Sequence, residues 1–378
     1  MLAIRAARLF DGRSVTLDPV VLVDAGRIAA VTDSAPAGSE ILDLGAATLM
    51  PGLVDAHTHL ALDASDDPIG RVVAASDDEL LDHMRAAART ALAAGVTTVR
   101  DLGDRGYLSL VLREELARDP MAGPRVLAAG PPITTTGGHC WFLGGEADGV
   151  EGIRAAVRER AEHGVDVIKI MATGGELTPG SRADTPQYGL DELRAAVDEA
   201  HRHGLPVTAH AHAAGTIVDA VAAGVDMIEH CSYATDEVID ALRMAGTVVS
   251  VTVGADPGVP YPPRLITLLV EYFQMVTRLR TAGVPVVCGS DAGIREAKPH
   301  GVLPYGVAAL VERAGFSPAE ALRSATSLAA EACGLGDSKG VVAPGYDADL
   351  LAVNGNPLID IAALTRVRAV LRAGTLVS

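Results

Sequence analysis

One local pattern recurs along the middle of this chain: a helix-like segment ends in a glycine, and an apolar run rich in β-branched residues follows. The pattern occurs six times, at Gly95, Gly164, Gly204, Gly224, Gly246 and Gly283. A glycine after a helix supplies a left-handed cap at little steric cost. A continuous run of valine and isoleucine is typical of a parallel strand buried on both faces. The pattern therefore predicts repeated α/β units built on parallel strands.

Two further apolar runs, near residues 52–57 and 125–129, bring the number of predicted strands to eight. Amphipathic stretches between the strands, such as 77–94, 190–203 and 264–282, are long enough to be crossover helices. Eight strands that alternate with helices favour a closed (β/α)₈ barrel of the TIM type over an open sheet. The sequence has neither a G-x-G-x-x-G turn nor a P-loop, so nucleotide-binding folds lose their main support.

Both ends of the sequence differ from this repeat. Residues 1–50 and 341–378 hold short alternating runs separated by glycine, aspartate and proline, which indicate β-hairpins. We expect the two ends to pair into one small β-sandwich domain. The predicted domains are therefore residues 1–51 with 340–378 for the sandwich, and residues 52–339 for the barrel.

Charge and cysteine content limit the partners and the compartment. A formal net charge of −17 argues against nucleic acid or an anionic membrane, because both attract basic surfaces. No apolar run approaches the roughly 18 residues that a bilayer span needs, and Arg5 and Arg8 interrupt the first apolar stretch, unlike a signal peptide. The four cysteines form no C-x-x-C pair, which fits a reducing compartment. We expect a cytoplasmic protein that acts on a small molecule and has the option of forming a homo-oligomer.

Histidines gather at the predicted C-terminal ends of the strands, where barrel enzymes carry their active sites. His57 and His59 lie two apart on one strand, so both imidazoles point to the same side. His210 and His230 end two later strands, and Asp291 ends the last one. Imidazole and carboxylate are suitable ligands for zinc and related metals. An H-x-H pair alone is a weak signal, but this combination of strand ends predicts a metal site.

Lys169 lies within an otherwise apolar strand, with Val165 and Val167 on its face. A buried lysine is energetically costly unless it is paired or neutralised. A surface role does not explain Lys169 if the strand is central to the fold. We therefore include Lys169 in the predicted site.

Several segments together resemble a known family. PGLVDAHTHL, VIKIMATGG, AHAHAAG, IEH and CGSDAG resemble the amidohydrolase superfamily, and most closely its branch of Xaa-Pro dipeptidase-like, ochratoxinase-like and imidazolonepropionase-like proteins. The resemblance covers essentially the whole chain and includes PGYDADLLAVNGNP near the end, which is similar to the family's return to the β-sandwich. These motifs are specific for the superfamily and much less so for a substrate.

The resemblance implies a metal centre with two divalent ions, of which zinc is the first expectation. His57 and His59 would bind one ion, with Asp291 as a further ligand. His210 and His230 would bind the second ion. Asp291 would also accept the proton of the attacking water and pass it to the leaving nitrogen.

The same resemblance implies roles for five more side chains. Lys169 would be carboxylated by CO₂, so that its carbamate bridges both ions and an awkward buried cation becomes an anionic ligand. His139 and His212 would orient the substrate or hold the carbonyl oxygen, with His212 a weaker ligand candidate than its neighbours. Tyr233 and Arg295 are candidate anchors for a substrate carboxylate.

The predicted activity is cleavage of an amide C–N bond by metal-activated hydroxide, in a dipeptide of the Xaa-Pro type or in an N-acyl amino acid. One alternative is a mononuclear cyclic-amide hydrolase or deaminase of the imidazolonepropionase type, which does not require Lys169. The other is a catalytically silent relative that serves as a scaffold. Such relatives typically lose metal ligands, whereas this sequence keeps all six.

Overall fold

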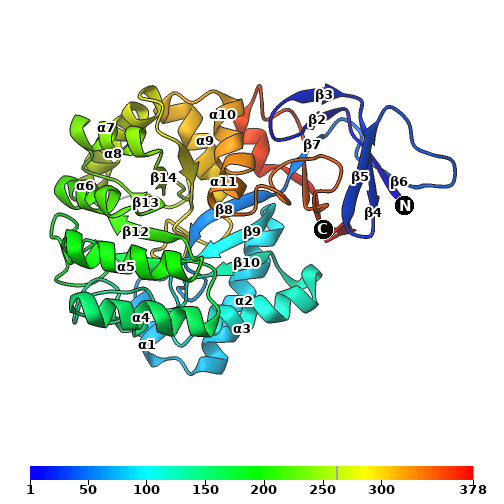
Figure 1. Ribbon diagram of the computed structural model, residues 1–378. Coiled ribbons are helices and arrows are strands. Elements are labelled where there is room, and N and C mark those ends of the chain that lie inside the picture. The colour runs from blue at the N-terminus through cyan, green and yellow to red at the C-terminus, as the bar shows by residue number, and fades with distance from the viewer. Residues whose placement is uncertain (261–262, 378) are drawn as a thin grey trace.

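The computed structural model describes residues 1–260 and 263–377. All eight predicted parallel strands are present, and those labelled in Figure 1 lie in the larger part of the molecule. These strands are β8 (Leu53–Thr58), β9 (Val96–Asp101), β10 (Arg125–Ala128), β11 (Ile168–Met171), β12 (Val207–Ala211), β13 (Met227–His230), β14 (Val248–Val251) and β15 (Val286–Cys288). β11 begins four residues after Gly164, and Asp166 before it is bonded to β10, where its carboxylate accepts a hydrogen bond from the Ala128 N–H at 2.8 Å.

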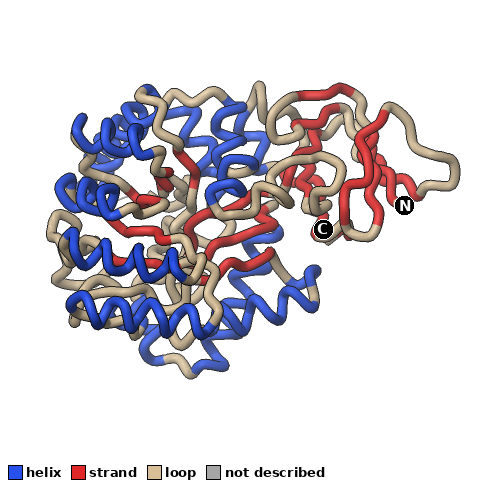
Figure 2. The backbone as a smooth tube through the Cα atoms, in the orientation of Figure 1, coloured by secondary structure: helices blue, strands red, loops and turns tan. Residues whose placement is uncertain are grey.

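Helices follow these strands and lie around them, as Figure 2 shows. They are α1 (Pro68–Ala74), α2 (Asp77–Ala93), α3 (Leu108–Arg118), α4 (Gly149–His163), α5 (Leu190–Arg202), α6 (Ala214–Ala223), α7 (Asp236–Ala245), α8 (Pro263–Thr281), α9 (Leu303–Ala314), α10 (Pro318–Ser324) and α11 (Ser327–Ala332). The three helices predicted by residue range match α2, α5 and α8 within one residue at each end. The six glycines of the repeated pattern all have positive φ, as the predicted caps require.

The parallel strands lie in two sheets, with the orders β10-β9-β8 and β11-β12-β13-β14-β15. Single parallel bridges join the outer edges of these sheets. Thr58 in β8 pairs with Ala292 after β15, and Ile133 after β10 pairs with Ile170 in β11. The prediction of an α/β fold with parallel sheets is therefore confirmed, while full closure into a barrel stays a prediction that the two bridges support.

The terminal segments form two further sheets, with the orders β5-β4-β1-β6 and β18-β17-β16-β7-β2-β3. Their strands are β1 (Leu2–Arg5), β2 (Arg8–Phe10), β3 (Val15–Leu17), β4 (Val20–Asp24), β5 (Arg27–Thr32), β6 (Glu40–Asp43), β7 (Thr48–Pro51), β16 (Leu350–Val353), β17 (Val367–Arg372) and β18 (Thr375–Leu376). The two ends of the chain meet where β7 pairs with β16 in antiparallel register, Leu49 opposite Ala352. In Figure 1 these strands gather to one side of the parallel strands, next to both termini.

Both terminal sheets contribute to one buried apolar cluster. Ile4 and Val21 come from the first sheet, and Leu49, Leu350 and Leu371 come from the second. This shared cluster agrees with the predicted β-sandwich, although its standing as a separate domain stays a prediction. The structure also contains the expected hairpins β4–β5 and β17–β18.

Two features bear on the expected environment of the chain. Across residues 1–260 and 263–377, no helix combines the length and apolar character that crossing a membrane requires. All four cysteines are free thiols, and Cys140, Cys231 and Cys288 are buried.

Candidate metal centre

A first group of possible metal ligands forms where β8 and β15 end. His57 lies in β8, His59 follows it by two residues, and Asp291 follows β15. The Nε2 atoms of the two histidines are 3.3 Å apart, and Asp291 Oδ1 lies 3.4 Å from His57 Nε2 and 3.5 Å from His59 Nε2. All three side chains are buried. Three donor atoms that converge on one point are suited to a divalent cation.

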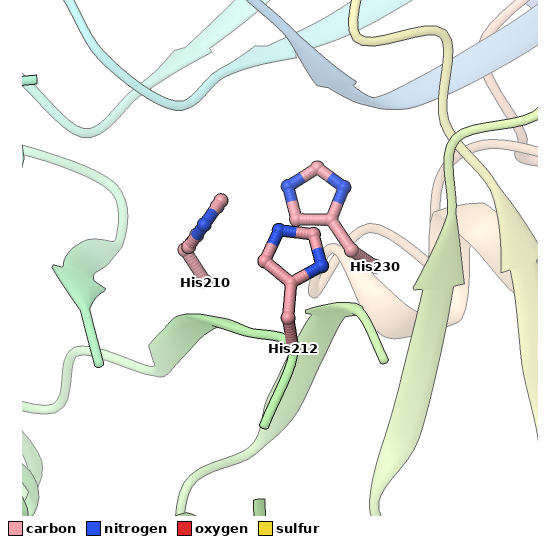
Figure 3. Close-up of side chains that lie close together, drawn as sticks. All are labelled: His210, His212 and His230. Carbon is pink, nitrogen blue, oxygen red and sulfur yellow. The ribbon is translucent and has the colours of Figure 1, made fainter. Parts of the chain in front are cut away.

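A second group forms at the ends of β12 and β13. Figure 3 shows His210, His212 and His230 gathered around a common space, and one nitrogen of each lies within 4.8 Å of the others. The rings of His212 and His230 are stacked with centroids 4.9 Å apart. His212 therefore belongs geometrically with the two expected ligands, although the sequence favoured an orienting role for it. Its Nδ1 lies 2.8 Å from Ser232 Oγ, so Nε2 is the ring nitrogen left for other contacts.

The two groups adjoin each other. The ring centroids of His57 and His230 are 5.0 Å apart, and those of His210 and His139 are 4.7 Å apart. All ten side chains that the sequence predicted for the site line a single pocket. They are His57, His59, His139, Lys169, His210, His212, His230, Tyr233, Asp291 and Arg295. Residues from the strands β8, β11, β12 and β13, and from the loops after β8, β10, β12, β13 and β15, therefore converge, although more than 230 positions of sequence separate the first from the last.

Lys169 is the side chain of this pocket whose surroundings are most unusual. It is only 1% exposed, and its Nζ has no hydrogen-bond partner within the described residues. Burial lowers the pKa of this amine below its ordinary value. An unpartnered buried amine among imidazoles and a carboxylate is unfavourable by itself. The arrangement is chemically reasonable if the amine is converted to an anionic ligand between two cations.

The backbone at two candidate ligand positions lies in the left-handed region. His230 has φ +71° and Asp291 has φ +55°, whereas most residues other than glycine avoid positive φ. The Asp291 N–H donates to the His57 carbonyl oxygen at 2.7 Å, which stabilises this conformation and fixes Asp291 against β8. Backbone strain of this kind concentrates at functional sites. There the function requires one side-chain orientation, and the surrounding structure holds the backbone in the less favourable conformation that provides it.

One carboxylate behind the candidate ligands was missed by the sequence reasoning. Glu229, in β13, lies with its Oε2 2.7 Å from His57 Nδ1 and its Oε1 3.0 Å from Arg100 Nη2. Burial alone would raise the pKa of Glu229, but the neighbouring His57 and Arg100 lower it below the ordinary value. The signal was present in the sequence, because Glu229 is a charged residue within the apolar run that ends at His230.

Asp55 supports the first group from the same strand. Its Oδ1 accepts hydrogen bonds from the Ser290 N–H at 2.9 Å and from the His57 N–H at 3.3 Å. Burial raises the pKa of Asp55 to about 6, although the bonds from Ser290 oppose this shift. Asp55 therefore ties the end of β8 to the turn that carries Asp291.

The candidate substrate residues differ in their surroundings. His139 is buried, and burial lowers its pKa to about 3. It lies so close to Gly175 that a Cβ there would approach its Nε2 to 2.5 Å, so a larger residue at 175 would displace the His139 ring. Tyr233 is 45% exposed, with its ring centroid 6.3 Å from that of His212. The neutral His139 imidazole and the phenol of Tyr233 thus lie at opposite levels of the pocket, one deep and one at the rim.

Other side chains of the pocket were not among the predicted site residues. Lys298 is buried at its wall, and Glu176, Tyr272 and the apolar Leu268 also line it. Lys298 follows Asp291 by seven residues in a loop, where no periodic pattern marks a buried lysine. The leucine and Tyr272 belong to α8, whose packing over the pocket cannot be deduced from its own amphipathic pattern.

Imidazole and carboxylate groups around one pocket at the ends of parallel strands define a candidate metal-dependent enzyme of the α/β class. The chain belongs to the amidohydrolase family, whose profile matches residues 48–377. This family comprises metal-using hydrolases, and its solved members imply a TIM barrel for the parallel sheets.

Similar proteins support the branch that the motifs indicate. Ochratoxinase from Aspergillus niger is 29% identical over 361 residues, which cover 85% of this chain and 73% of that protein. Imidazolonepropionase from Salinispora tropica is 28% identical over 395 residues, covering 94% of this chain and 92% of that protein. A solved Xaa-Pro dipeptidase with methionine in its active site superposes with a TM-score of 0.89 at 30% identity, covering 99% of both chains. The resemblance to this branch is confirmed.

Proposed function

We propose that this protein is a binuclear metal-dependent amidohydrolase that cleaves a C–N amide bond in a dipeptide or an N-acyl amino acid. The unpartnered, buried Lys169 in the pocket of both histidine groups carries the proposal. A single ion held by His57, His59 and Asp291 would leave the amine without a role. Two ions with a bridging carbamate give every one of the six ligand side chains a function.

His57, His59 and Asp291 would hold one ion, and His210 and His230 would hold the other, with the carbamate of Lys169 between them. His212 lies close enough to His210 and His230 to be an additional ligand. The carbamate forms when the neutral amine attacks CO₂, which creates an N–C bond and releases one proton. Divalent ions, zinc by first choice, would supply a Lewis acid that polarises a carbonyl and lowers the pKa of water.

Side chains of the protein would transfer the proton and bind the carbonyl oxygen of the substrate. Asp291 Oδ1 faces the space between His57 and His59 and is positioned to accept the proton of the attacking water. It can return this proton to the departing nitrogen. His139, held neutral by burial, can donate one N–H to the oxygen of the scissile carbonyl. The second candidate for this role is His212, whose orientation is fixed by Ser232.

The proposed substrate class is supported by a solved relative and by two side chains that line the pocket. A solved relative is a Xaa-Pro dipeptidase, and a small acyl amino acid offers the same amide bond next to a carboxylate. Tyr233 and Arg295 line the pocket and are suited to bind that carboxylate. The zinc- or cobalt-loaded protein, supplied with bicarbonate, should therefore hydrolyse Xaa-Pro dipeptides or N-acyl amino acids in preference to cyclic amides. Hydrolysis of cyclic amides alone would contradict this proposal.

The similarity to imidazolonepropionase keeps a mononuclear cyclic-amide hydrolase or deaminase as the second candidate. Metal analysis separates the two, because the proposal requires two ions per chain and the rival requires one. A silent scaffold would bind no metal after purification with zinc and would hydrolyse nothing in the panel.

Three further features belong to the proposal. We place residues 52–339 in a closed (β/α)₈ barrel and residues 1–51 with 340–378 in a β-sandwich domain, in agreement with the two bridges and the shared apolar cluster. The free thiols favour a cytoplasmic location. A homo-oligomer remains compatible with this architecture.

A further inference from the structure

Lys298 is a buried lysine that the proposed mechanism does not use. It lies in the loop between Asp291 and α9, is 7% exposed, and lines the pocket. Its ammonium donates to the Ser290 carbonyl oxygen at 2.8 Å and to the Thr252 carbonyl oxygen at 2.9 Å. A lysine has three N–H donors, so these two carbonyls take most of its capacity.

The first carbonyl belongs to the residue directly before Asp291. Ser290 is further fixed by its N–H, which donates to Asp55 Oδ1 at 2.9 Å. Asp291 itself has the left-handed backbone described above. The bond from Lys298 therefore holds the peptide that sets the direction of the Asp291 side chain.

The second carbonyl belongs to a residue that contacts the other group of ligands. Thr252 follows β14, and its Oγ1 lies 3.0 Å from His230 Nδ1. Tyr272 adds to this connection, because its hydroxyl donates to the His230 carbonyl oxygen at 2.9 Å and accepts from the Thr252 N–H at 3.3 Å. The Thr252 peptide is thus coupled to both the ring and the backbone of His230.

The loop that carries Lys298 is itself closed by backbone bonds. The Lys298 N–H donates to the Arg295 carbonyl at 2.8 Å, and the Gly293 N–H donates to the Lys298 carbonyl at 2.8 Å. The Asp256 N–H donates to the Ala297 carbonyl at 2.8 Å, which fastens this loop to the segment after β14. Hydrogen bonds therefore fix the backbone of Lys298, and its ammonium connects this loop to the segments of Ser290 and Thr252.

We propose that Lys298 is a positioning residue that sets the distance between the two metal-ligand groups by clamping the Ser290 and Thr252 peptides together. This inference rests on the proposed binuclear function. An ammonium next to two dications is electrostatically unfavourable, so its presence requires a compensating benefit, and the two carbonyl bonds provide one. The side chain acts through Asp291 and His230 and does not take part in the chemistry.

The test compares Lys298→Met, which keeps the bulk of the side chain and removes its donors, with Glu296→Gln as control. Glu296 is an exposed residue of the same loop. Zinc stoichiometry and affinity are measured by titration of the metal-free protein, together with kcat and KM for the best substrate of the panel. Loss of a residue behind a metal ligand typically weakens metal binding by about 10–100-fold. In Lys298→Met we expect metal binding to weaken by this factor for at least one ion, and kcat to fall at a similar KM. The control should keep the wild-type values.

Two results would overturn the inference: wild-type affinity for both ions in folded Lys298→Met, or a rise in KM alone, which would make Lys298 a substrate-binding residue. If Lys298→Met does not fold, Thr252→Val decides, because it removes only the Oγ1 contact to His230. Weaker binding of one ion in this variant supports the coupling, and unchanged binding of both ions contradicts it. A wild-type protein that binds fewer than two ions would instead refute the proposed function itself.

Discussion

The carboxylate of Glu229 lies 2.7 Å from Nδ1 of His57, and both side chains are buried. Glu229 is held in turn by Arg100 and by the hydroxyl of Thr208. The hydrogen bond assigns the His57 proton to Nδ1, which leaves the Nε2 lone pair directed toward His59 and Asp291. A carboxylate behind a histidine in this way orients the ring and raises its basicity toward a metal.

Glu229→Gln is therefore expected to weaken zinc binding at the first group by about 10–100-fold. The amide preserves the shape of the side chain but loses its charge, so Arg100 is left with a weaker partner. Competition with a chromogenic chelator would measure the change. Glu312→Gln, at an exposed position of α9, is the matched control and should bind zinc as the wild type does. Equal affinities in the two variants would contradict the orienting role of Glu229.

Asp291→Asn should reduce kcat by about 10²–10⁴-fold, because the amide neither accepts the proton of water nor returns it to the leaving nitrogen. The fold should be retained, since the backbone bond from Asp291 to His57 does not involve the side chain. Steady-state kinetics with circular dichroism would check both points. Activity within a few-fold of the wild type would remove Asp291 from its role as proton carrier.

Lys169→Ala should lower the metal content from two ions to one or none and abolish the dependence of activity on bicarbonate. The shortened side chain leaves space at the bridging position, so a small carboxylate such as propionate should restore part of the activity. Metal analysis and native mass spectrometry would test this, the latter by looking for the mass of one CO₂ in the wild type only. An unchanged metal content in the variant would favour the mononuclear alternative.

A fourth prediction concerns stability, at a buried cluster of three charged residues in the C-terminal part of the chain. Asp349, just before β16, accepts two hydrogen bonds from Arg372 Nη1, at 2.8 and 3.0 Å, and one from Lys339. Burial alone would raise the pKa of Asp349, but Lys339 and Arg372 lower it below the ordinary value. Because the folded pKa is lowered, the stabilisation is complete above the unfolded pKa of about 4 and is lost as pH falls through the folded pKa.

Asp349→Asn should therefore cost about 3–5 kcal/mol at pH 7, because the buried Arg372 loses its carboxylate partner and the buried Lys339 keeps only Asp347. Urea unfolding at several pH values would show the difference from the wild type shrinking as pH falls below about 4. Asp360→Asn breaks an exposed pair with Arg366 and should change little. A difference that does not depend on pH would show that the charge of Asp349 is not what stabilises the fold.

Much of the parallel α/β part could be predicted because each strand carries its own local signals. Glycines such as Gly95 and Gly224 end a helix and begin an apolar run, and both take the predicted positive φ. The hydrogen bond from the Ala128 N–H of β10 to the carboxylate of Asp166, just before β11, could not be predicted from either segment. Such a contact joins segments that are distant in sequence.

The same distinction explains which site residues were found. His57, Lys169 and His210 stand out as polar residues within or at the end of apolar strands, so their direction follows from the strand itself. Lys298 lies in an irregular loop, and its burial depends on two carbonyls from other segments. The membership of His212 in a ligand group likewise depends on how β12 and β13 lie side by side.

The pairing of β7 with β16 has a consequence for how the chain is made. β7 is separated only by Gly52 from β8, the strand that carries His57, yet its partner Leu350–Val353 is synthesised about 300 residues later. A growing polypeptide on the ribosome therefore leaves one edge of β7 unpaired until residues 350–353 have emerged. β7 can pair early with β2 on one side, but its partner on the other side, β16, is made only after the whole parallel α/β part.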